Sequence, residues 1–198
     1  MPHDPFILNR RQLFLLGAAA ARLAAAEDDF WNTKPSAEWN AGDIYRLMNH
    51  SPWAKPVQWW HPFPTPIEPP IRSQLGPKGV VTWESAQPIR DAQKAPLPRV
   101  LANFYVIGVD GIPLGNHSAG YLRRFAVLRS HGRPKWAVGA SVARELIRNS
   151  SVYAFGFSKA AAIGPDTADL VFEMHFGQWM IQTKFKPRDM LYHGGLAL

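Results

Sequence analysis

The sequence predicts an α+β fold, a two-layer sandwich of mainly antiparallel sheet with a few short helices and a proline-rich strap. Three observations support this prediction. Runs of β-branched and aromatic residues bounded by turn residues recur along the chain, as is typical of strands. Short amphipathic segments that fit single helices lie between these runs. Eight prolines fall between Pro52 and Pro77, which excludes regular helix and inner strand there.

The composition divides the chain into four parts. These are an export signal at residues 1–26, a small helical N-terminal module at residues 27–57, the proline-rich strap at residues 58–78 and an α+β domain at residues 79–198. Strands are expected in the segments 79–86, 100–113, 151–158, 168–176 and 178–186, with a final short strand near the C-terminus. Because Gly177 separates two of these segments, residues 168–186 are predicted to form a hairpin.

The N-terminal module contains one clear helix signal. Asn40 is a favourable N-cap residue, and Asp43 stands three positions later, where it can complete a capping box. Ile44, Leu47 and Met48 then fall on one face of a short helix, which Pro52 ends.

Residues 85–95 are expected to form a short helix or a turn, and two further helices are expected in the α+β domain at residues 116–129 and 138–150. The first of these two has apolar residues at helical spacing, namely Tyr121, Leu122, Phe125 and Leu128. The second would place Val142, Leu146 and Ile147 inward and its arginines outward.

Residues 1–26 have the organisation of an export signal. A polar start ends in Arg10 and Arg11, and the apolar run that follows has nine residues, whereas a membrane-spanning helix needs about 20. Ala24 and Ala26 then form the small-residue pattern that signal peptidase cleaves. The arginine pair resembles the bacterial twin-arginine signal, with the general secretory route as the alternative. We therefore expect a periplasmic or secreted protein without a permanent membrane anchor. Its expected partners are the twin-arginine export machinery, which translocates it, and signal peptidase, which cleaves it. The competing interpretation is an N-terminal helix that packs on the domain.

The proline-rich strap carries adjacent tryptophans, Trp59 and Trp60. Neighbouring side chains of an extended segment point to opposite sides. Either the strap packs across the sheet and buries its aromatic residues, or it exposes one of them as part of a binding surface.

The charge balance is basic, with 22 lysines and arginines against 15 acidic residues. Seven of the basic residues lie close together in the sequence: Arg123, Arg124, Arg129, Arg133, Lys135, Arg144 and Arg148. They form either a solvated helix surface or a docking patch for anionic envelope polymer or lipid head groups. Nucleic acid is disfavoured by the expected location.

Signatures of catalysis are missing from the sequence. With no cysteine, the chain has no disulfide, thiol nucleophile, thiolate zinc site or iron–sulfur cluster. No G-x-S-x-G motif and no paired carboxylates are present, so we assign no catalytic residue and predict no cofactor.

One pair of neighbouring side chains in the sequence could belong to a metal site. Glu173 and His175 stand two positions apart, so on a strand they project from the same face. With His193 from a neighbouring strand they could bind copper or zinc. A solvated Glu–His pair on a hairpin is the alternative.

Three segments resemble parts of a family of uncharacterised exported bacterial proteins: SPWAK at residues 51–55, WESAQPIR at residues 83–90 and FKPRDMLYHGGLAL at residues 185–198. The last is similar to a tail of the form FKLKDMVYQGKLEL in that family. The resemblance implies an exported α+β domain, and because the family has no established activity it implies no catalytic residue.

These observations favour a non-enzymatic binding or accessory domain of the cell envelope. The alternatives are an exported hydrolase whose site is assembled only in the fold, and a periplasmic metal-binding protein. An enzyme should show a deep cleft where polar residues with shifted pKa values converge, whereas a binding module should show a shallow apolar or basic face.

Overall fold

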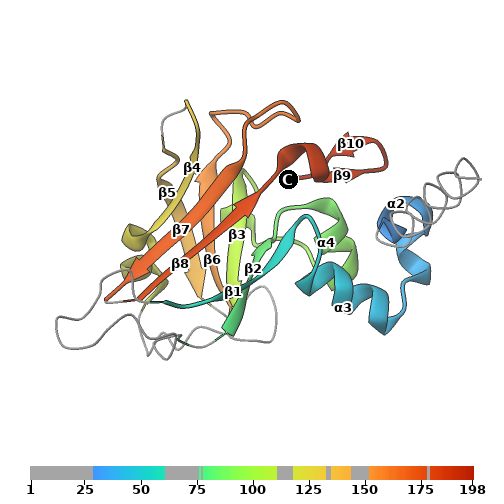
Figure 1. Cartoon of the computed structure of the whole chain (residues 1–198), viewed down its shortest axis with the longest axis horizontal. Coiled ribbons are helices and arrows are strands. Elements are labelled where there is room, and N and C mark those ends of the chain that lie inside the picture. Colours follow the sequence, from blue (N-terminus) through green and yellow to red (C-terminus); the bar gives the residue numbers. More distant parts are fainter. Residues whose placement is uncertain are drawn as a thin grey trace, which may run out of the picture.

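The structure is a computed structural model and describes residues 29–60, 76, 78–110, 118–132, 135–143, 152–177 and 179–198. Two sheets make up most of it (Figure 1). The larger sheet has the strand order β1 (Ala54–Gln58), β2 (Lys78–Trp83), β3 (Phe104–Asp110), β6 (Tyr153–Ser158) and β5 (Val138–Ala143). The smaller sheet has the order β4 (Ala126–Ser130), β7 (Leu170–Phe176) and β8 (Trp179–Phe185). All neighbouring strands in both sheets pair antiparallel, so the predicted α+β class with mainly antiparallel sheet is confirmed.

Two isolated bridges tie the edges of the sheets to each other. Beyond the end of β1, Trp60 and Met180 of β8 exchange backbone hydrogen bonds of 3.0 and 2.8 Å. Just before β5, the N–H of Trp136 donates to the carbonyl oxygen of Leu128 in β4 at 2.8 Å. Each sheet edge is therefore partly paired with the other sheet, which limits the exposure of unpaired backbone groups.

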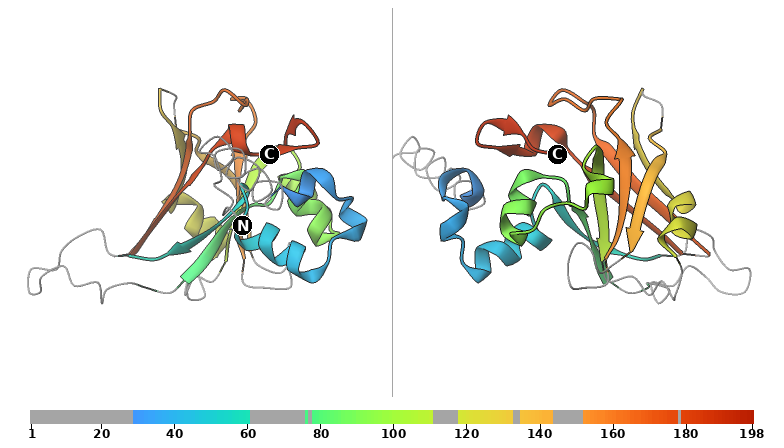
Figure 2. Two further views of the ribbon diagram at one scale, coloured as in Figure 1. Left: turned by 45° about the vertical axis from the view of Figure 1, so that its right-hand side comes forward. Right: turned by 180° about the vertical axis from the view of Figure 1, so that it is seen from behind.

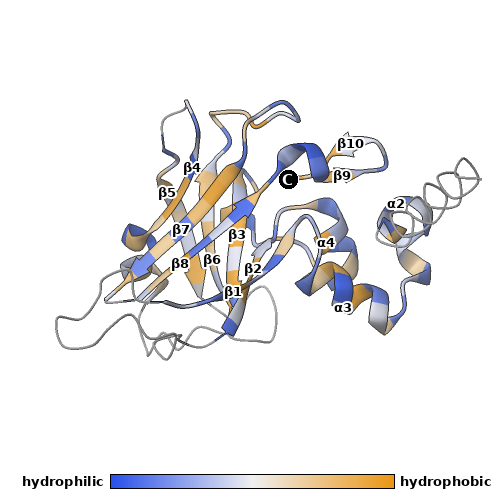
Figure 3. Ribbon diagram, viewed as in Figure 1, coloured by the Kyte–Doolittle hydropathy of each residue, from blue (hydrophilic) through white to orange (hydrophobic). Residues whose placement is uncertain are grey.

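Aromatic side chains fill the space between the two sheets. Phe172 of β7 packs against Phe155 and Phe157 of β6, with ring centroids 6.4 and 6.3 Å apart. Trp83 of β2 meets Phe185 of β8 edge to face at 5.4 Å. All five side chains are fully buried, and Figure 3 shows the hydrophobic colouring along β6 and β7. Aromatic contacts thus join the two layers across one core.

Strand β6 is buried on both faces. Its outward positions are small, because Leu101 and Phe104 pack there against Ala154 and Gly156. A Cβ atom on Gly156 would lie 2.9 Å from the ring of Phe104, so no larger residue fits without a shift. This explains why the sequence of β6 shows little polar alternation.

The helices and a C-terminal hairpin lie together at one end of the sheets (Figures 1 and 2). These elements are α2 (Phe30–Thr33), η1 (Ser36–Glu38), α3 (Ala41–Asn49), α4 (Gln87–Gln93), η6 (Pro187–Asp189), β9 (Leu191–Tyr192) and β10 (Gly195–Leu196). The remaining short helices are η3 (Arg99–Leu101), α5 (Ala119–Leu122) and η4 (Arg123–Phe125). The indole N–H of the buried Trp53 donates to the carbonyl oxygen of Ala197 at 2.7 Å, which ties the C-terminus to the start of β1.

Helix α3 forms as the sequence predicts. The side chain of Asn40 accepts a hydrogen bond from the N–H of Asp43, and the carboxylate of Asp43 accepts one from the N–H of Asn40. Leu47 is fully buried, with Ile44 and Met48 packed beside it. A hydrogen bond from Lys34 is the main cause of a lowered pKa at Asp43.

Two other helix predictions are wrong over part of their length. Residues 116–129 were expected to be one helix, but helical structure ends at Phe125 and residues 126–130 form β4. Residues 138–143, the first part of the helix predicted at residues 138–150, form β5. In both places the pairing with a neighbouring strand outweighs the local helical spacing. Residues 144–150 lie outside the described residues.

The β7–β8 hairpin is confirmed. Gly177 adopts a φ of 58°, the left-handed conformation that favours glycine, directly after β7. The strands then pair from Phe176 with Trp179 to Leu170 with Phe185.

The core contact between the sheets predicts a large stability effect. Replacing Phe172 with alanine should lower the free energy of unfolding by about 3–5 kcal/mol, because a buried ring between the layers is lost and a cavity remains. Urea denaturation would measure the change. As a control, Val100→Ala shortens an apolar side chain that is 58% exposed and should change stability by about 0.5 kcal/mol or less. Equal effects of the two substitutions would contradict the described core.

Candidate functional site

A basic depression of about 720 Å³ lies where β4 ends, β7 begins and β8 ends. Its titratable and charged lining residues are Arg129, His131, Lys135, Asp169, Lys184 and Arg188. Four of these carry a permanent positive charge and one is an acid. The side chains of Lys184 and Arg188 are 59% and 72% exposed, so the depression is open to solvent.

The register of the small sheet brings two of these cations together. Arg129 of β4 pairs with Val171 of β7, and Val171 pairs with Lys184 of β8. Directly paired residues project from the same face of a sheet. Arg129 and Lys184 therefore flank Val171 on the outer face, while Leu128, Leu170 and Phe185 face the core.

The rim formed by the turn after β4 is anchored by two contacts. The hydroxyl of Ser130 donates to the carbonyl oxygen of Ala168 at 3.0 Å, which joins the end of β4 to the chain that enters β7. Trp136 is buried and paired with Leu128, so its neighbour Lys135 is held at the rim. Gly132 turns the chain with a φ of 70°.

Three of the four cations already have an acidic neighbour. Arg129 Nη2 lies 2.8 Å from Glu173 Oε2, and Lys184 Nζ lies 3.5 Å from Asp169 Oδ2. Arg188 Nε lies 3.7 Å from Asp189 Oδ1, with both side chains largely exposed. No acidic partner of Lys135 is found in the described parts of the chain. The positive charge of the depression is therefore moderated by carboxylates of the same chain.

Among these acids, Glu173 accepts the largest number of hydrogen bonds. Its carboxylate accepts hydrogen bonds from Arg129 through both Nε and Nη2, from Gln182 Nε2 at 3.2 Å and, given the matching tautomer, from His175 Nε2 at 2.7 Å. Burial raises the pKa of Glu173, but these hydrogen bonds and the charge of Arg129 outweigh burial and lower the pKa. Glu173 is thus held as an anion that orients Arg129.

The structure divides the predicted basic patch. Arg123 and Arg124 lie in η4 at the start of β4, with the guanidinium of Arg124 5.1 Å from the ring centre of Tyr121. Arg129 lies near the other end of β4, about 15 Å away at the usual rise of a strand. The remaining arginines of the patch, Arg133, Arg144 and Arg148, lie outside the described residues.

Lys184 and Arg188 were missed by the sequence analysis. They follow Arg129 by more than fifty residues, and only the pairing of β4 with β7 brings them to the same depression. The position of Lys184 could have been predicted from the hairpin. The short turn at Gly177 fixes the register, which puts Lys184 on the same face as Val171 and Glu173.

The structure brings together only two of the three predicted metal ligands. His175 Nε2 lies 2.7 Å from Glu173 Oε1. His193 lies in the turn between β9 and β10, where its N–H donates to the side-chain oxygen of Asn32 at 2.8 Å. Across the described part of the chain, no three His, Asp or Glu side chains gather at one point.

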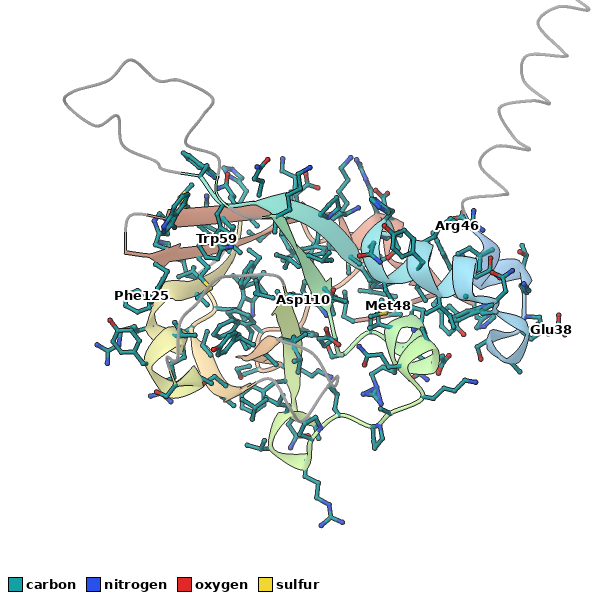
Figure 4. The ribbon with its side chains drawn as sticks, turned by 90° about the horizontal axis from the view of Figure 1, so that it is seen from below. Glu38, Arg46, Met48, Trp59, Asp110 and Phe125 are labelled. Atoms are coloured by element: carbon teal, nitrogen blue, oxygen red, sulfur yellow. The ribbon has the colours of Figure 1, made fainter. Side chains whose placement is uncertain are left out.

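The two tryptophans of the strap differ in burial, but neither is exposed. Trp59 is 1% exposed and belongs to the core, whereas Trp60 is partly buried and pairs with Met180. Figure 4 places Trp59 and Phe125 toward the same end of the molecule, away from Glu38 and Arg46. Residues 61–75 of the strap lie outside the described residues.

A second depression, of about 530 Å³, lies between η1 and α4. At its edge the hydroxyl of Tyr192 donates to Asp91 Oδ2 at 2.8 Å, and Gln87 donates to Asp91 Oδ1 at 2.6 Å. Burial and then the hydrogen bond and charge of Asp91 raise the pKa of Tyr192 to about 12, although a hydrogen bond with Ser36 lowers it. A phenol with this pKa stays protonated near neutral pH and is a poor general base. The network fastens the C-terminal hairpin to α4.

The predicted export residues Arg10, Arg11, Ala24 and Ala26 lie outside the described residues. Within the described ranges, no helix has the length and apolar character needed to cross a membrane.

Comparisons with protein-family models, curated protein sequences and solved structures found no match for the chain. The resemblance of residues 51–55, 83–90 and 185–198 to exported bacterial proteins therefore stays a prediction. In the last of these segments Phe185 and Met190 are fully buried, whereas Leu191 is exposed.

The Glu173 cluster predicts a pH-dependent stability difference. Because the pKa of Glu173 in the folded state is lowered from its ordinary value, ionised Glu173 stabilises the fold above the unfolded-state pKa. This contribution is lost as the pH falls through the folded-state pKa. Near pH 7 the free energy of unfolding of wild type should exceed that of Glu173→Gln by on the order of 1 kcal/mol. The partial exposure of Arg129 limits this difference, because solvent screens the ion pair.

Urea denaturation between about pH 7 and about pH 3 would test this linkage. The difference between wild type and Glu173→Gln should shrink toward the acidic limit. Asp166→Asn, which removes an exposed carboxylate from a turn, serves as the control and should show no comparable trend. A constant difference for Glu173→Gln at every pH would contradict the assignment.

Proposed function

We propose that the chain is an exported, non-enzymatic binding domain of the cell envelope, and that the basic depression holds an anionic partner. The observation that carries this proposal is the convergence of four cations from β4, the turn after it, β8 and η6 on one open depression. A concave site with a net positive charge attracts anions and raises their local concentration. An anionic envelope polymer or the head groups of anionic lipids fit this chemistry.

The same depression offers little to a hydrolase. Its serine, Ser130, is 7% exposed and donates its hydroxyl proton to the carbonyl oxygen of Ala168. A nucleophilic serine needs a base within hydrogen-bonding reach. Among the described lining residues, His131 and Asp169 are side chains that can act as a base. In the described part of the chain the Ser130 hydroxyl is hydrogen-bonded to Ala168 and to neither of these side chains, which favours binding over hydrolysis as the proposed function.

Binding of generic polyanions tests the proposal. The purified chain should bind dextran sulfate in isothermal titration calorimetry, and vesicles that contain phosphatidylglycerol in a sedimentation assay. Lys135→Gln/Lys184→Gln should weaken the binding about tenfold, because two lining charges are lost. Raising the salt concentration should weaken the wild-type interaction as well.

Arg123→Gln/Arg124→Gln is the matched control, since it removes two positive charges at the other end of β4. This variant should bind nearly as well as wild type. Stronger loss with the control than with the depression variant would move the site to η4. The proposed function would be overturned if neither dextran sulfate nor the vesicles bound.

Export is proposed from residues 1–26, and its test is independent of ligand binding. Replacing Arg10 and Arg11 with lysines should leave the full-length chain in the cytoplasm, because the twin-arginine route requires the pair. Wild-type protein recovered from the periplasm should have a mass that begins near Glu27. Export of the lysine variant would indicate the general secretory route, and intact full-length protein in the cytoplasm of wild-type cells would overturn export.

A further inference from the structure

Any anionic ligand of the basic depression must compete with carboxylates of the same chain for the cations. This inference rests on the function proposed above. Arg129, Lys184 and Arg188 lie 2.8, 3.5 and 3.7 Å from carboxylates of the same chain. A ligand that reaches these cations competes with Glu173 and Asp169 for their charge. The internal acids have an advantage, because they lose no translational freedom when they pair.

A single carboxylate on a ligand gains little in this competition, since it replaces one carboxylate with another. A phosphate group is a stronger competitor. A terminal phosphate carries close to two negative charges near neutral pH and offers three acceptor oxygens. The lysines and arginines of the depression are the side chains that suit such groups.

The spacing of the cations favours a ligand with more than one phosphate. Arg129 and Lys184 lie on the same face with one strand between them, which separates their backbones by about 10 Å. Arg129 uses its Nε and Nη2 atoms on Glu173, and a guanidinium has five N–H donors, so other donors remain. Lys135 and Arg188 add two further cations to the lining of the same depression. One small anion cannot contact all of these groups at once.

Nucleic acid is a poorer fit, although its backbone is also a chain of phosphates. Proteins that bind single strands stack the bases on aromatic side chains. None of the described residues that line the depression is Trp, Tyr or Phe. The described lining offers charge for a phosphate chain, and His131 is its one ring on which a base could stack.

We propose that the basic depression binds a linear chain of several phosphate groups, in preference to single phosphates, carboxylate polymers and nucleic acids. The chain spans Arg129 and Lys184 and extends along Lys135 and Arg188. The carboxylates of Glu173 and Asp169 yield to the phosphates and exclude weaker anions.

Calorimetry with the purified full chain tests this selectivity. The probes are orthophosphate, tripolyphosphate, poly-glutamate of matched charge, oligothymidylate and vesicles with phosphatidylglycerol. Tripolyphosphate should bind at least about tenfold more tightly than orthophosphate and than poly-glutamate at equal charge. Oligothymidylate or vesicles that bind more tightly than tripolyphosphate would overturn the inference in favour of nucleic acid or lipid phosphate.

Two variants test the competition itself. Asp169→Asn removes an internal competitor of the ligand and should tighten tripolyphosphate binding about fivefold. Asp166→Asn changes the net charge by the same amount from a turn outside the lining, and should have a much smaller effect. Lys184→Gln should weaken binding, and urea denaturation verifies that each variant is folded.

The outcomes separate this inference from the proposed function. Equal affinity for poly-glutamate and tripolyphosphate, or equal gains from the two aspartate variants, would overturn the phosphate selectivity and leave anion binding in place. Failure of all five probes and of dextran sulfate to bind would overturn both.

Discussion

The packing of Phe172 against Phe155 and Phe157 is the contact on which the rest of the structure depends, because it holds the two sheets face to face. Once the inner face of β7 is fixed by this contact, the period of two fixes the outer face as well. Leu170, Phe172 and Met174 are then committed to the core, and the residues between them must face outward. The core and the basic depression are therefore two faces of the same strands, and the register that serves one also places the other.

How far the sequence predicts this fold depends on the range of the interactions. Helix α3 and the β7–β8 hairpin are encoded locally, by the capping box at Asn40 and by Gly177, and both were predicted. Strand β4 is different. Phe125 and Leu128 share a helical spacing with Tyr121, yet only the first part of that segment is helical, because Leu128 pairs with Phe172 in the small sheet. A partner more than forty residues away decides the conformation, and local spacing contains no information about it.

The same distinction explains the candidate site. The local density of arginines predicts that Arg129 belongs to a basic patch, either a solvated helix surface or a docking surface for anions. Its actual neighbours, Lys184 and Arg188, come from β8 and η6. The two-residue turn at Gly177 could have placed Lys184 opposite Val171, since a short turn fixes the register of a hairpin. The pairing of Arg129 with Val171 has no such local signal, and it is this pairing that completes the depression.

The acids beside the basic depression affect both the stability of the fold and the anion binding proposed for it. Four cations around one depression repel each other, and this repulsion would weaken the fold if nothing opposed it. Glu173 and Asp169 relieve the repulsion at Arg129 and Lys184, so the domain can hold these side chains in position before a ligand arrives. Charges arranged in advance reduce the ordering cost of binding. The same acids weaken the field that a singly charged anion meets, because each must be displaced or shared. Stability of the unliganded depression and the proposed discrimination against weak anions would therefore have one physical origin, the placement of carboxylates of this chain next to its own cations.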